Sequence, residues 1–425
     1  MEIIQSLQEQ NAAHKPAVVS KGRLLLFSYF FPPIQTQMAP AVVKPMAALT
    51  RYGFEVDVLC AAPFSKYYSN DESLLPFVNK YFPKITRLQP GDGFLEKLRL
   101  RSKILSTRPD IMSILQHEAF GTLMDMDLTQ YQAIMTWSPA HSINPVMVKL
   151  KKYRRETRWL AQFGDPWAGN PLDRRILAKV WNEWQEPYTV AAADFIVHSS
   201  SYSRNLMVKK HGANLVAKSG VIPHCYDSEL FPQRAKAINE RVTLRNIGSL
   251  YGRRSPEPLF EALNKLLERR PELRDRLRIE LVGSVPREML ESSSALALPA
   301  GMVTHLPHVT YLESLEKMYD ADILVLIEAN VRQNLFLPSK LSDYIGAGTP
   351  IVGIAPPGES EDALRGLGCW HARPSDIAGI SDAIERAVNH VMNTPEAAWC
   401  NEAYKQLINC GHVAKQFAHI LDKIK

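Results

Sequence analysis

The segment FLPSKLSDYIGAGTPIVGI, residues 336–354, places a serine, a lysine and an aspartate ahead of two glycines and a proline. Ser339 can cap the helix that follows, which leaves free backbone amides and the positive end of the helix dipole at that terminus. Such a terminus binds phosphate readily, and Lys340 would add a cation beside it. Asp343, one turn further on, could accept hydrogen bonds from two ribose hydroxyls. The segment predicts a site for a diphosphate and a ribose; the alternative is a surface helix whose charges face water.

A second segment, RNIGSLYGRRSPEPLFEAL (245–263), has the same design. A predicted strand ends at Gly248, a loop carries Arg253 and Arg254, and a helix begins near Pro256. Arginine suits a diphosphate because its planar guanidinium contacts two oxygens at once. The alternative is a surface turn with solvated arginines. Neither segment contains GxxxxGK[ST] or GxGxxG, so the sequence does not favour nucleotide hydrolysis or NAD binding.

In the first half of the chain, FGDPWAGNPL (163–172) puts polar and aromatic side chains just past a predicted strand. Asp165, Trp167 and Asn170 are candidates to hold a sugar or to assist an acceptor hydroxyl, with Asp165 the candidate catalytic group. A lone histidine is more often structural than catalytic, but three fall near strand ends: His141, His198 and His224. No group of residues has metal-ligand spacing, so we expect no required metal.

Short apolar runs that alternate with amphipathic stretches must position these residues. They predict strands at 23–29, 55–61, 133–137, 158–163, 194–199, 241–247, 278–283, 322–327 and 350–354. Alternating strands and helices indicate an α/β fold with parallel sheets, and two such series indicate two doubly wound domains that face each other. Ligands bind such sheets at the carboxyl ends of the strands, so the cleft between the domains is the expected site.

The predicted boundaries follow from these two series. We expect an N-terminal extension at 1–22, a first Rossmann-like domain at 23–215, a linker at 216–240 and a second Rossmann-like domain at 241–394. A C-terminal helix at 395–425 would pack back on the first domain.

Composition is that of a globular protein, with 46% hydrophobic and 22% charged residues among 425. Five scattered cysteines without a CxxC pair fit a reducing cytosol. No apolar run approaches the roughly 20 residues that span a bilayer. The net charge of +6 is concentrated in two basic clusters, at 97–103 and 149–158. These could contact anionic lipid at the inner face of a membrane, or be solvated helix faces; nucleic-acid binding is disfavoured because aromatic residues are not interleaved.

The order and spacing of several motifs resemble the family-four glycosyltransferases, which are retaining, nucleotide-sugar-dependent enzymes with the GT-B fold. LLLFSYFFPP followed by GFEVDVL, and FGDPW, resemble a subgroup with Tyr-Phe-Pro-Pro and Asp-Pro-Trp elements. IGSLYGRRSPEPLFEAL, LVGSVP and LPSKLSDYIGAGTPIVG resemble the successive donor-site segments of the second domain. The likeness spreads over most of residues 23–355.

The resemblance assigns roles by position. Arg254 falls at the family's phosphate-binding lysine, and Ser339 and Lys340 match the Ser-Lys beside the diphosphate. Asp343 falls at the second glutamate of a paired-glutamate motif, which implies contact with the ribose. The chain departs from the family in several places. Leu335 replaces the first glutamate, and Ser249 replaces a phosphate-binding arginine. The glycine-rich loop after Pro-Pro is IQTQMAP, and Gln162 and Gly164 stand where the subgroup commonly has aspartate and arginine.

The implied activity is transfer of a sugar from a nucleotide donor, with retention, to a glycan or lipid-linked acceptor of the cell envelope or an exopolysaccharide. Two alternatives stay open. An epimerase of the same architecture would need acids and histidines close to the sugar, for which His141 and His224 are candidates. A non-catalytic GT-B scaffold or regulatory protein would explain the missing glutamate and arginine.

Overall fold

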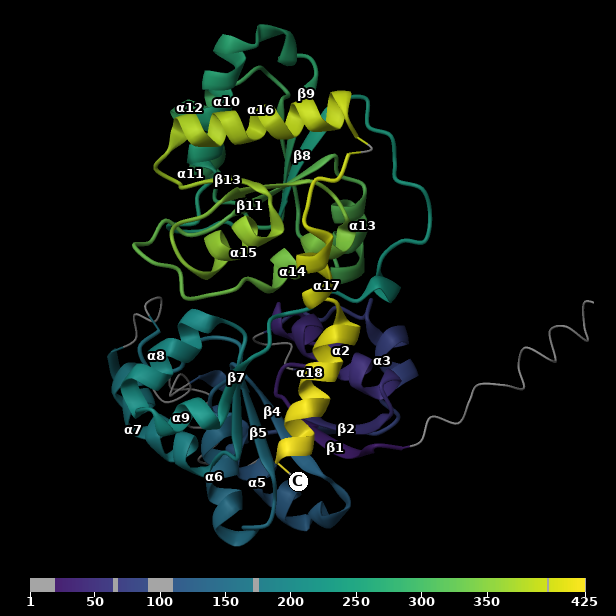
Figure 1. Ribbon diagram of the computed structural model, residues 1–425, viewed down its shortest axis with the longest axis vertical. Coiled ribbons are helices and arrows are strands. Elements are labelled where there is room, and N and C mark those ends of the chain that lie inside the picture. Colours follow the sequence, from purple (N-terminus) through teal and green to yellow (C-terminus); the bar gives the residue numbers. More distant parts are fainter. Residues whose placement is uncertain (1–19, 64–67, 91–109, 171–175, 396, 425) are drawn as a thin grey trace, which may run out of the picture.

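The computed structural model describes residues 20–63, 68–90, 110–170, 176–395 and 397–424, which form two α/β domains stacked end to end (Figure 1). Residues 1–19 of the predicted N-terminal extension lie outside the described residues, and so does the basic cluster at 97–103. Within the described residues, no helix combines the length and the apolarity needed to cross a bilayer.

The N-terminal domain is built on a parallel sheet in the order β3-β2-β1-β4-β5-β6-β7. Its strands are β1 (Gly22–Phe27), β2 (Phe54–Ala61), β3 (Ile85–Leu88), β4 (Ala133–Ser138), β5 (Trp159–Phe163), β6 (Phe195–His198) and β7 (Ser219–Val221). Its helices are α2 (Met38–Arg51), α3 (Leu75–Tyr81), α5 (Gln116–Asp125), α6 (Ile143–Tyr153), α7 (Ile176–Ala192), α8 (Ser201–His211) and α9 (Asn214–Ala217).

The C-terminal domain has a second parallel sheet in the order β10-β9-β8-β11-β12-β13. Its strands are β8 (Val242–Ile247), β9 (Leu277–Val282), β10 (Val303–Leu306), β11 (Ile323–Ile327), β12 (Ile351–Ile354) and β13 (Trp370–Ala372). Its helices are α10 (Glu257–Arg269), α11 (Arg287–Leu290), α12 (Ser293–Leu296), α13 (Tyr311–Tyr319), α14 (Ser339–Ala347), α15 (Glu359–Leu367) and α16 (Ile377–Asn393). Short 3-10 turns lie at Ile111–Leu115, Leu128–Gln130, Ser228–Leu230 and Pro271–Leu273.

Both faces of each sheet are buried, which explains why the central strands are continuous apolar runs. Alternate residues of a strand point to opposite faces. In β1, Leu24 and Leu26 belong to one hydrophobic core, whereas Leu25 and Phe27 belong to the other. The prediction of two doubly wound parallel domains is confirmed.

All nine predicted strands are present, with boundaries within two residues. Four further strands, β3, β7, β10 and β13, were not predicted, and all four lie at sheet edges. Because β7 ends at Val221, the N-terminal sheet extends into the segment predicted as linker. The single helix predicted for 395–425 is two helices, α17 (Glu402–Leu407) and α18 (Cys410–Lys423).

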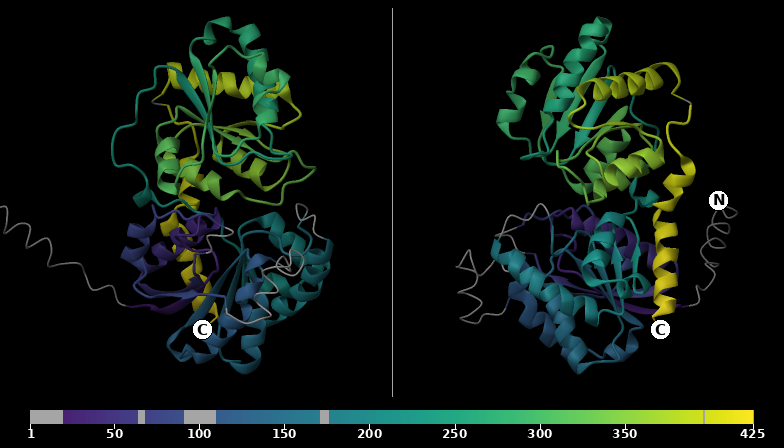
Figure 2. Two further views of the ribbon diagram at one scale, coloured as in Figure 1. Left: turned by 180° about the vertical axis from the view of Figure 1, so that it is seen from behind. Right: turned by 60° about the vertical axis from the view of Figure 1, so that its left-hand side comes forward.

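The last helix returns to the first domain. α18 packs along α2, and Val413, Phe417 and Leu421 join the core on that side of the N-terminal sheet (Figures 1 and 2). The chain passes between the domains in two segments, one near Tyr226 and one near Cys410. These segments lie side by side, because the amide of Cys410 donates to the carbonyl of Tyr226 at 3.0 Å. The chain thus connects the domains twice at one place.

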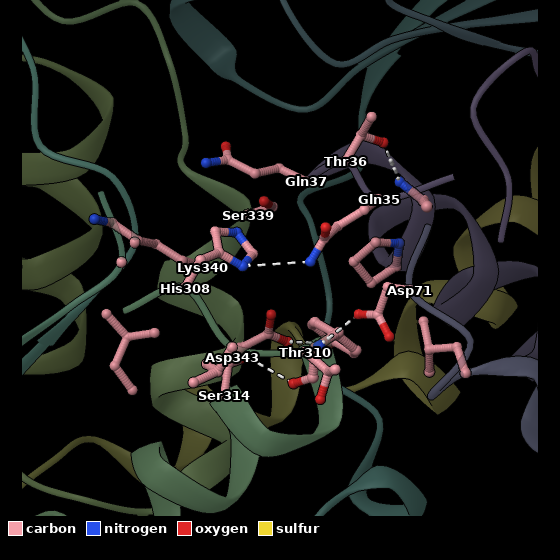
Figure 3. A pocket seen from close by; sticks show the side chains of 18 of the residues that line it. Gln35, Thr36, Gln37, Asp71, His308, Thr310, Ser314, Ser339, Lys340 and Asp343 are labelled. Atoms are coloured by element: carbon pink, nitrogen blue, oxygen red, sulfur yellow. Dashed lines mark hydrogen bonds between the residues drawn. The ribbon is translucent and has the colours of Figure 1, made fainter. Parts of the chain in front are cut away.

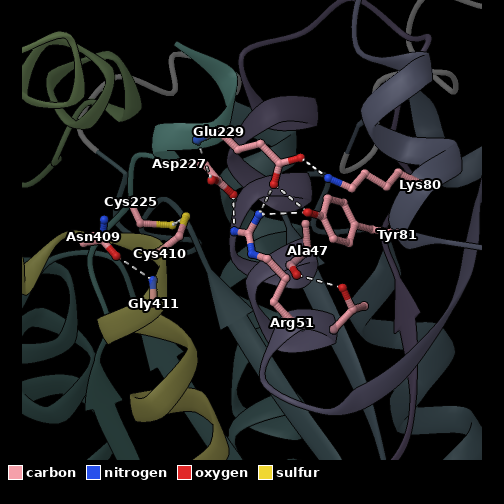
Figure 4. A network of polar contacts seen from close by, with 11 residues as sticks. Ala47, Arg51, Lys80, Tyr81, Cys225, Asp227, Glu229, Asn409, Cys410 and Gly411 are labelled. Carbon is pink, nitrogen blue, oxygen red and sulfur yellow. Dashed lines mark hydrogen bonds and ion pairs between the residues drawn. The ribbon is translucent and has the colours of Figure 1, made fainter. Parts of the chain in front are cut away.

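A polar network connects the linker segment after Tyr226 to α2 (Figure 4). The Arg51 guanidinium pairs with Asp227 and, at 2.8 Å, with Glu229. The Tyr81 hydroxyl donates to Glu229 at 2.5 Å, and the Lys80 ammonium also contacts Glu229. Arg51 therefore anchors the linker to the end of α2.

Candidate functional site

Two adjoining pockets lie between the domains, at the carboxyl ends of the strands of both sheets. We call them the Asp343 pocket and the Asp165 pocket. Gln37, Ser339 and Lys340 line both of them. The Asp343 pocket is further lined by Gln35, Asp71, Gly248, Ser249, His308 and Tyr311 (Figure 3). The Asp165 pocket is further lined by His141, Trp167, Asn170, Arg254 and Glu328.

Lys340 is the central cation of the site. It is the second residue of α14. The prediction that Ser339 caps this helix is wrong, because the N-cap is Pro338 and no side chain among the described residues caps the helix, so its first backbone amides have no intrahelical partner. Burial, and then the charge of Arg254, lowers the pKa of the Lys340 ammonium to about 8. In the described part of the chain, no hydrogen-bond acceptor or carboxylate pairs with that ammonium. Gly248, at φ +121°, has no side chain and leaves space beside it.

Arg254 reaches the same pocket from the loop after β8. Its Nη2 lies 3.1 Å from the Glu328 carboxylate, which directly follows β11. Its Nε is buried and, among the described residues, has no hydrogen-bond partner. Arg254 and Lys340 therefore concentrate positive charge that Glu328 only partly balances. Arg253 is different, because its side chain is exposed and lines neither pocket.

Asp343 lies one turn further along α14 and is held by one residue of each domain. Its Oδ1 accepts a hydrogen bond from the Tyr311 hydroxyl at 3.1 Å and forms an ion pair with the Lys44 ammonium of α2. Burial raises the pKa of the Asp343 carboxyl, and Lys44 opposes that shift. The predicted ribose-binding carboxylate thus lines a pocket while already paired on one oxygen.

Asp165 follows β5 on the other wall of the cleft. Its carboxylate is partly exposed to the pocket and accepts no hydrogen bond from the described residues. Burial raises its pKa to about 6. The His141 ring stacks on Trp167, with centroids 5.2 Å apart and planes 12° from parallel. The Trp167 indole is buried and donates to Asn182 Oδ1 at 2.9 Å, which fixes this ring pair.

The other two histidines differ in position. His224 lines the Asp165 pocket, and burial lowers its pKa to about 4, so the ring is neutral near pH 7. His198 is buried in the N-terminal domain, its Nδ1 lies 3.3 Å from the Ser203 hydroxyl, and it lines neither pocket.

The structure brings most of the predicted site residues together. A single pocket holds Asp165, His141, Trp167, Asn170, Arg254, Ser339 and Lys340, and Asp343 lines the adjoining one. Sequence reasoning missed Lys44 and Tyr311. Lys44 was detectable in principle, because it is a charged residue within the apolar helix MAPAVVKPMAALTR.

The arrangement suits a ligand with a diphosphate. Cationic side chains and helix amides bind phosphate oxygens, and a carboxylate beside them accepts hydrogen bonds from hydroxyls. The opposite wall offers a carboxylate and stacked rings, which suit a sugar or another hydroxylated ligand.

Comparison with known proteins agrees with this architecture. No family model matches the chain. A D-inositol 3-phosphate glycosyltransferase of Geodermatophilus obscurus is 26% identical over 218 residues, and the alignment covers 47% of this chain and 47% of that relative. The chain thus matches about half the length of this curated relative.

Solved structures match over nearly the whole chain. HepE of Anabaena in complex with UDP and glucose has a TM-score of 0.67 at 12% identity, with 95% of this chain and 100% of that chain covered. Sucrose-phosphate synthase of Thermosynechococcus elongatus has a TM-score of 0.62 at 16% identity, with 95% and 99% covered. The lipopolysaccharide outer core galactosyltransferase WaaB has a TM-score of 0.57 at 12% identity, with 94% and 99% covered. With its two facing parallel sheets, the chain has the GT-B fold.

Proposed function

We propose that the protein is a glycosyltransferase that moves a hexosyl group from a nucleotide sugar to a glycan or lipid-linked glycan acceptor, with retention of anomeric configuration. The observation that carries this proposal is the convergence of Arg254 and Lys340 on one interdomain pocket, with the Lys340 ammonium unpaired among the described residues. A nucleoside diphosphate leaving group develops negative charge as the glycosidic bond breaks. Preorganised cations and amides stabilise that charge most strongly in the transition state.

The neighbours support the donor class. HepE was crystallised with UDP and glucose and with UDP-glucose, and the curated relative is a glycosyltransferase. We therefore take UDP-hexoses as the first donors to test. Ser339 and the first amides of α14 complete the diphosphate site in this proposal, and Arg253 is left out of it because its side chain is exposed and lines neither pocket.

The acceptor would enter the Asp165 pocket. Asp165 is mostly ionised at neutral pH, since its pKa is about 6, and it lines the same pocket as Arg254 and Lys340. An ionised carboxylate in that position can accept a proton or a hydrogen bond from an acceptor hydroxyl. His141 and Asn170 line the same wall as sugar contacts.

The acceptor side also carries a surface suited to a membrane. Val180, Trp184 and Tyr188 lie at four-residue spacing on α7 and are 66%, 60% and 52% exposed. α7 packs beside α6, whose C-terminal turn begins the basic cluster at 149–158. Exposed aromatic side chains next to cations favour the interface of an anionic bilayer. We propose peripheral contact there, at the cytoplasmic face, where a lipid-linked acceptor of envelope or exopolysaccharide synthesis would be available.

Turnover tests this proposal directly. Purified protein is incubated with UDP-glucose, UDP-galactose and their GDP and ADP counterparts, together with lipid and glycan acceptors. We expect acceptor-dependent release of one nucleoside diphosphate, and a product whose anomeric proton coupling in NMR matches that of the donor. Arg254→Ala should lower kcat/KM by roughly tenfold or more, because a charge-assisted contact is worth about 1.5–3 kcal/mol. Inversion of the anomeric centre would contradict retention.

One observation favours a second candidate, a non-catalytic GT-B protein that binds a nucleotide. Leu335 occupies the position at which the glycosyltransferase family that the chain resembles has its first glutamate. The backbone carbonyl of Leu335 accepts a hydrogen bond from the Ser200 hydroxyl of the opposite domain at 2.7 Å. Ser249 likewise offers no cation to the Asp343 pocket. Nucleotide binding without turnover on any donor and acceptor pair would support this candidate over an enzyme.

A further inference from the structure

The two oxygens of the Asp343 carboxylate have different surroundings. Lys44 and Tyr311 both contact Oδ1, whereas Oδ2 accepts no hydrogen bond from the described residues. Asp343 lines the pocket, so Oδ2 is the oxygen left for a ligand (Figure 3). We infer that Lys44 of the N-terminal domain is a positioning residue for the ribose of the donor, acting through Asp343 of the C-terminal domain. This inference rests on the proposed function and adds a residue to its donor site.

Lys44 is buried against the Asp343 carboxylate. Its side chain is buried in α2, only 1% of the residue is exposed, and Asp343 is its ion-pair partner. A buried lysine loses hydration, a cost that is recovered only when a carboxylate lies close by in good geometry. The Lys44 ammonium also lies 5.7 Å from the centroid of the Tyr311 ring, so all three groups pack together.

The ion pair with Lys44 determines both the charge and the orientation of the Asp343 carboxylate. Burial alone favours the neutral form of Asp343, and the adjacent ammonium favours the ionised form. With Oδ1 held by two donors, the carboxylate plane is fixed and Oδ2 is presented to the pocket. A fixed, ionised oxygen accepts hydrogen bonds from the 2′- and 3′-hydroxyls of a ribose more strongly than a neutral or rotating carboxyl would.

The contact also joins the two domains. Lys44 lies on α2, and Asp343 on α14 of the other domain. The ribose site is therefore complete only when the domains have this relative position. Donor binding and domain closure would then favour each other, because each stabilises the same arrangement.

The test compares ribose with a sugar that lacks its hydroxyls. Binding of UDP, GDP and ADP and of their 2′,3′-dideoxy counterparts is measured by calorimetry in the wild type and in Lys44→Met. We expect the substitution to weaken binding of the preferred ribonucleotide by roughly tenfold to a hundredfold, the range for a lost hydrogen bond to a charged group. Binding of the dideoxy nucleotide should change by less than about threefold, because no hydroxyl contacts Asp343 in that complex.

Arg51→Met is the matched control. Arg51 lies on the same helix two turns further on and also makes ion pairs, but with Asp227 and Glu229 of the linker and not with the pocket (Figure 4). It should lower the thermal midpoint and leave the ratio of ribose to dideoxyribose affinity unchanged. Tyr311→Phe removes only the hydroxyl, and should reduce that ratio in the same direction as Lys44→Met but by less.

The outcomes separate the inference from the proposed function. Equal losses for both kinds of nucleotide in Lys44→Met would show a merely structural lysine and overturn the inference, while nucleotide binding itself would stand. If Lys44→Met does not fold, Tyr311→Phe decides by the same ratio, with an unchanged ratio overturning the inference. A wild type that binds none of the three diphosphates would overturn the proposed function as well.

Discussion

Lys340 and Asp343 lie on one helical turn but have opposite surroundings. Asp343 is neutralised by Lys44, whereas Lys340 faces Arg254 and has no paired carboxylate within the described residues. Positive charge is therefore left over on the side of the pocket assigned to the diphosphate. An anion bound there would stabilise the protonated form of Lys340 and raise its pKa.

This predicts a pH dependence of nucleotide affinity. In the free protein the Lys340 ammonium has a pKa of about 8. A bound diphosphate would raise this pKa, because its negative charge favours the protonated form. Protonated lysine is already present below pH 8, so affinity should be level there and should fall as pH rises above 8, approaching tenfold per unit. Calorimetry of UDP, GDP or ADP from pH 7 to 9.5 measures this. Lys340→Met should bind more weakly and show no such fall; a level wild-type profile would contradict the role of Lys340.

Single residues differed in how well the sequence predicted them. Arg254 and Asp165 lie in the loops after strands, and Lys340 lies at the start of the helix after β11, where the topology of a parallel sheet fixes their destination. Lys44 occupies a helix interior, and its partner Asp343 lies 299 positions away in the sequence. Nothing in the local pattern predicts such a contact, because it depends on how the two domains dock. Arg253 and Arg254 are neighbours in the sequence, yet only the loop conformation decides which of them reaches the pocket.

At the scale of elements, α7 presents apolar side chains to solvent, which requires a reason. Val180, Trp184 and Tyr188 lie on its outer face, and the Trp184 and Tyr188 rings contact each other with centroids 6.0 Å apart. Exposed apolar side chains that gather on one helix face mark an interaction surface more often than isolated ones do. Lys179, also exposed, adds a cation at the edge of this face.

The expected result is binding of the protein to anionic vesicles through α7. Trp184→Ser with Tyr188→Ser should reduce co-sedimentation with phosphatidylglycerol vesicles by roughly tenfold or more, since burying each large side chain contributes about 1.5–3 kcal/mol. Ile238→Ser is the control, because Ile238 is 98% exposed in the linker, remote from α7. Undiminished vesicle binding by the double variant, or no vesicle binding by the wild type, would refute the membrane role.

The elements that were missed share a physical cause. β3, β7, β10 and β13 are edge strands of three or four residues, and most of their residues are only partly buried. An edge strand has a neighbour on one side and needs no continuous apolar run, so its sequence resembles a loop. The central strands are covered on both faces, and their sequences therefore identified them.

At the scale of the whole molecule, the two domains meet around the cleft. Besides the Lys44 contact, the hydroxyls of Ser200 and Ser201 on the N-terminal domain bind Leu335 and Glu359 on the C-terminal one. α18 crosses back and packs on α2, so both chain connections lie at the same end of the interface.

The central claim is that Arg254 and Lys340 bind a diphosphate in that cleft. Calorimetry of uridine against UDP, and of guanosine and adenosine against GDP and ADP, measures it directly in the wild type and in Arg254→Ala with Lys340→Met. One diphosphate should bind at least about a hundredfold more tightly than its nucleoside, because two cationic contacts contribute roughly 1.5–3 kcal/mol each, and the double variant should lose most of that difference. Equal affinity for diphosphate and nucleoside, or an advantage that survives in the double variant, would contradict the claim.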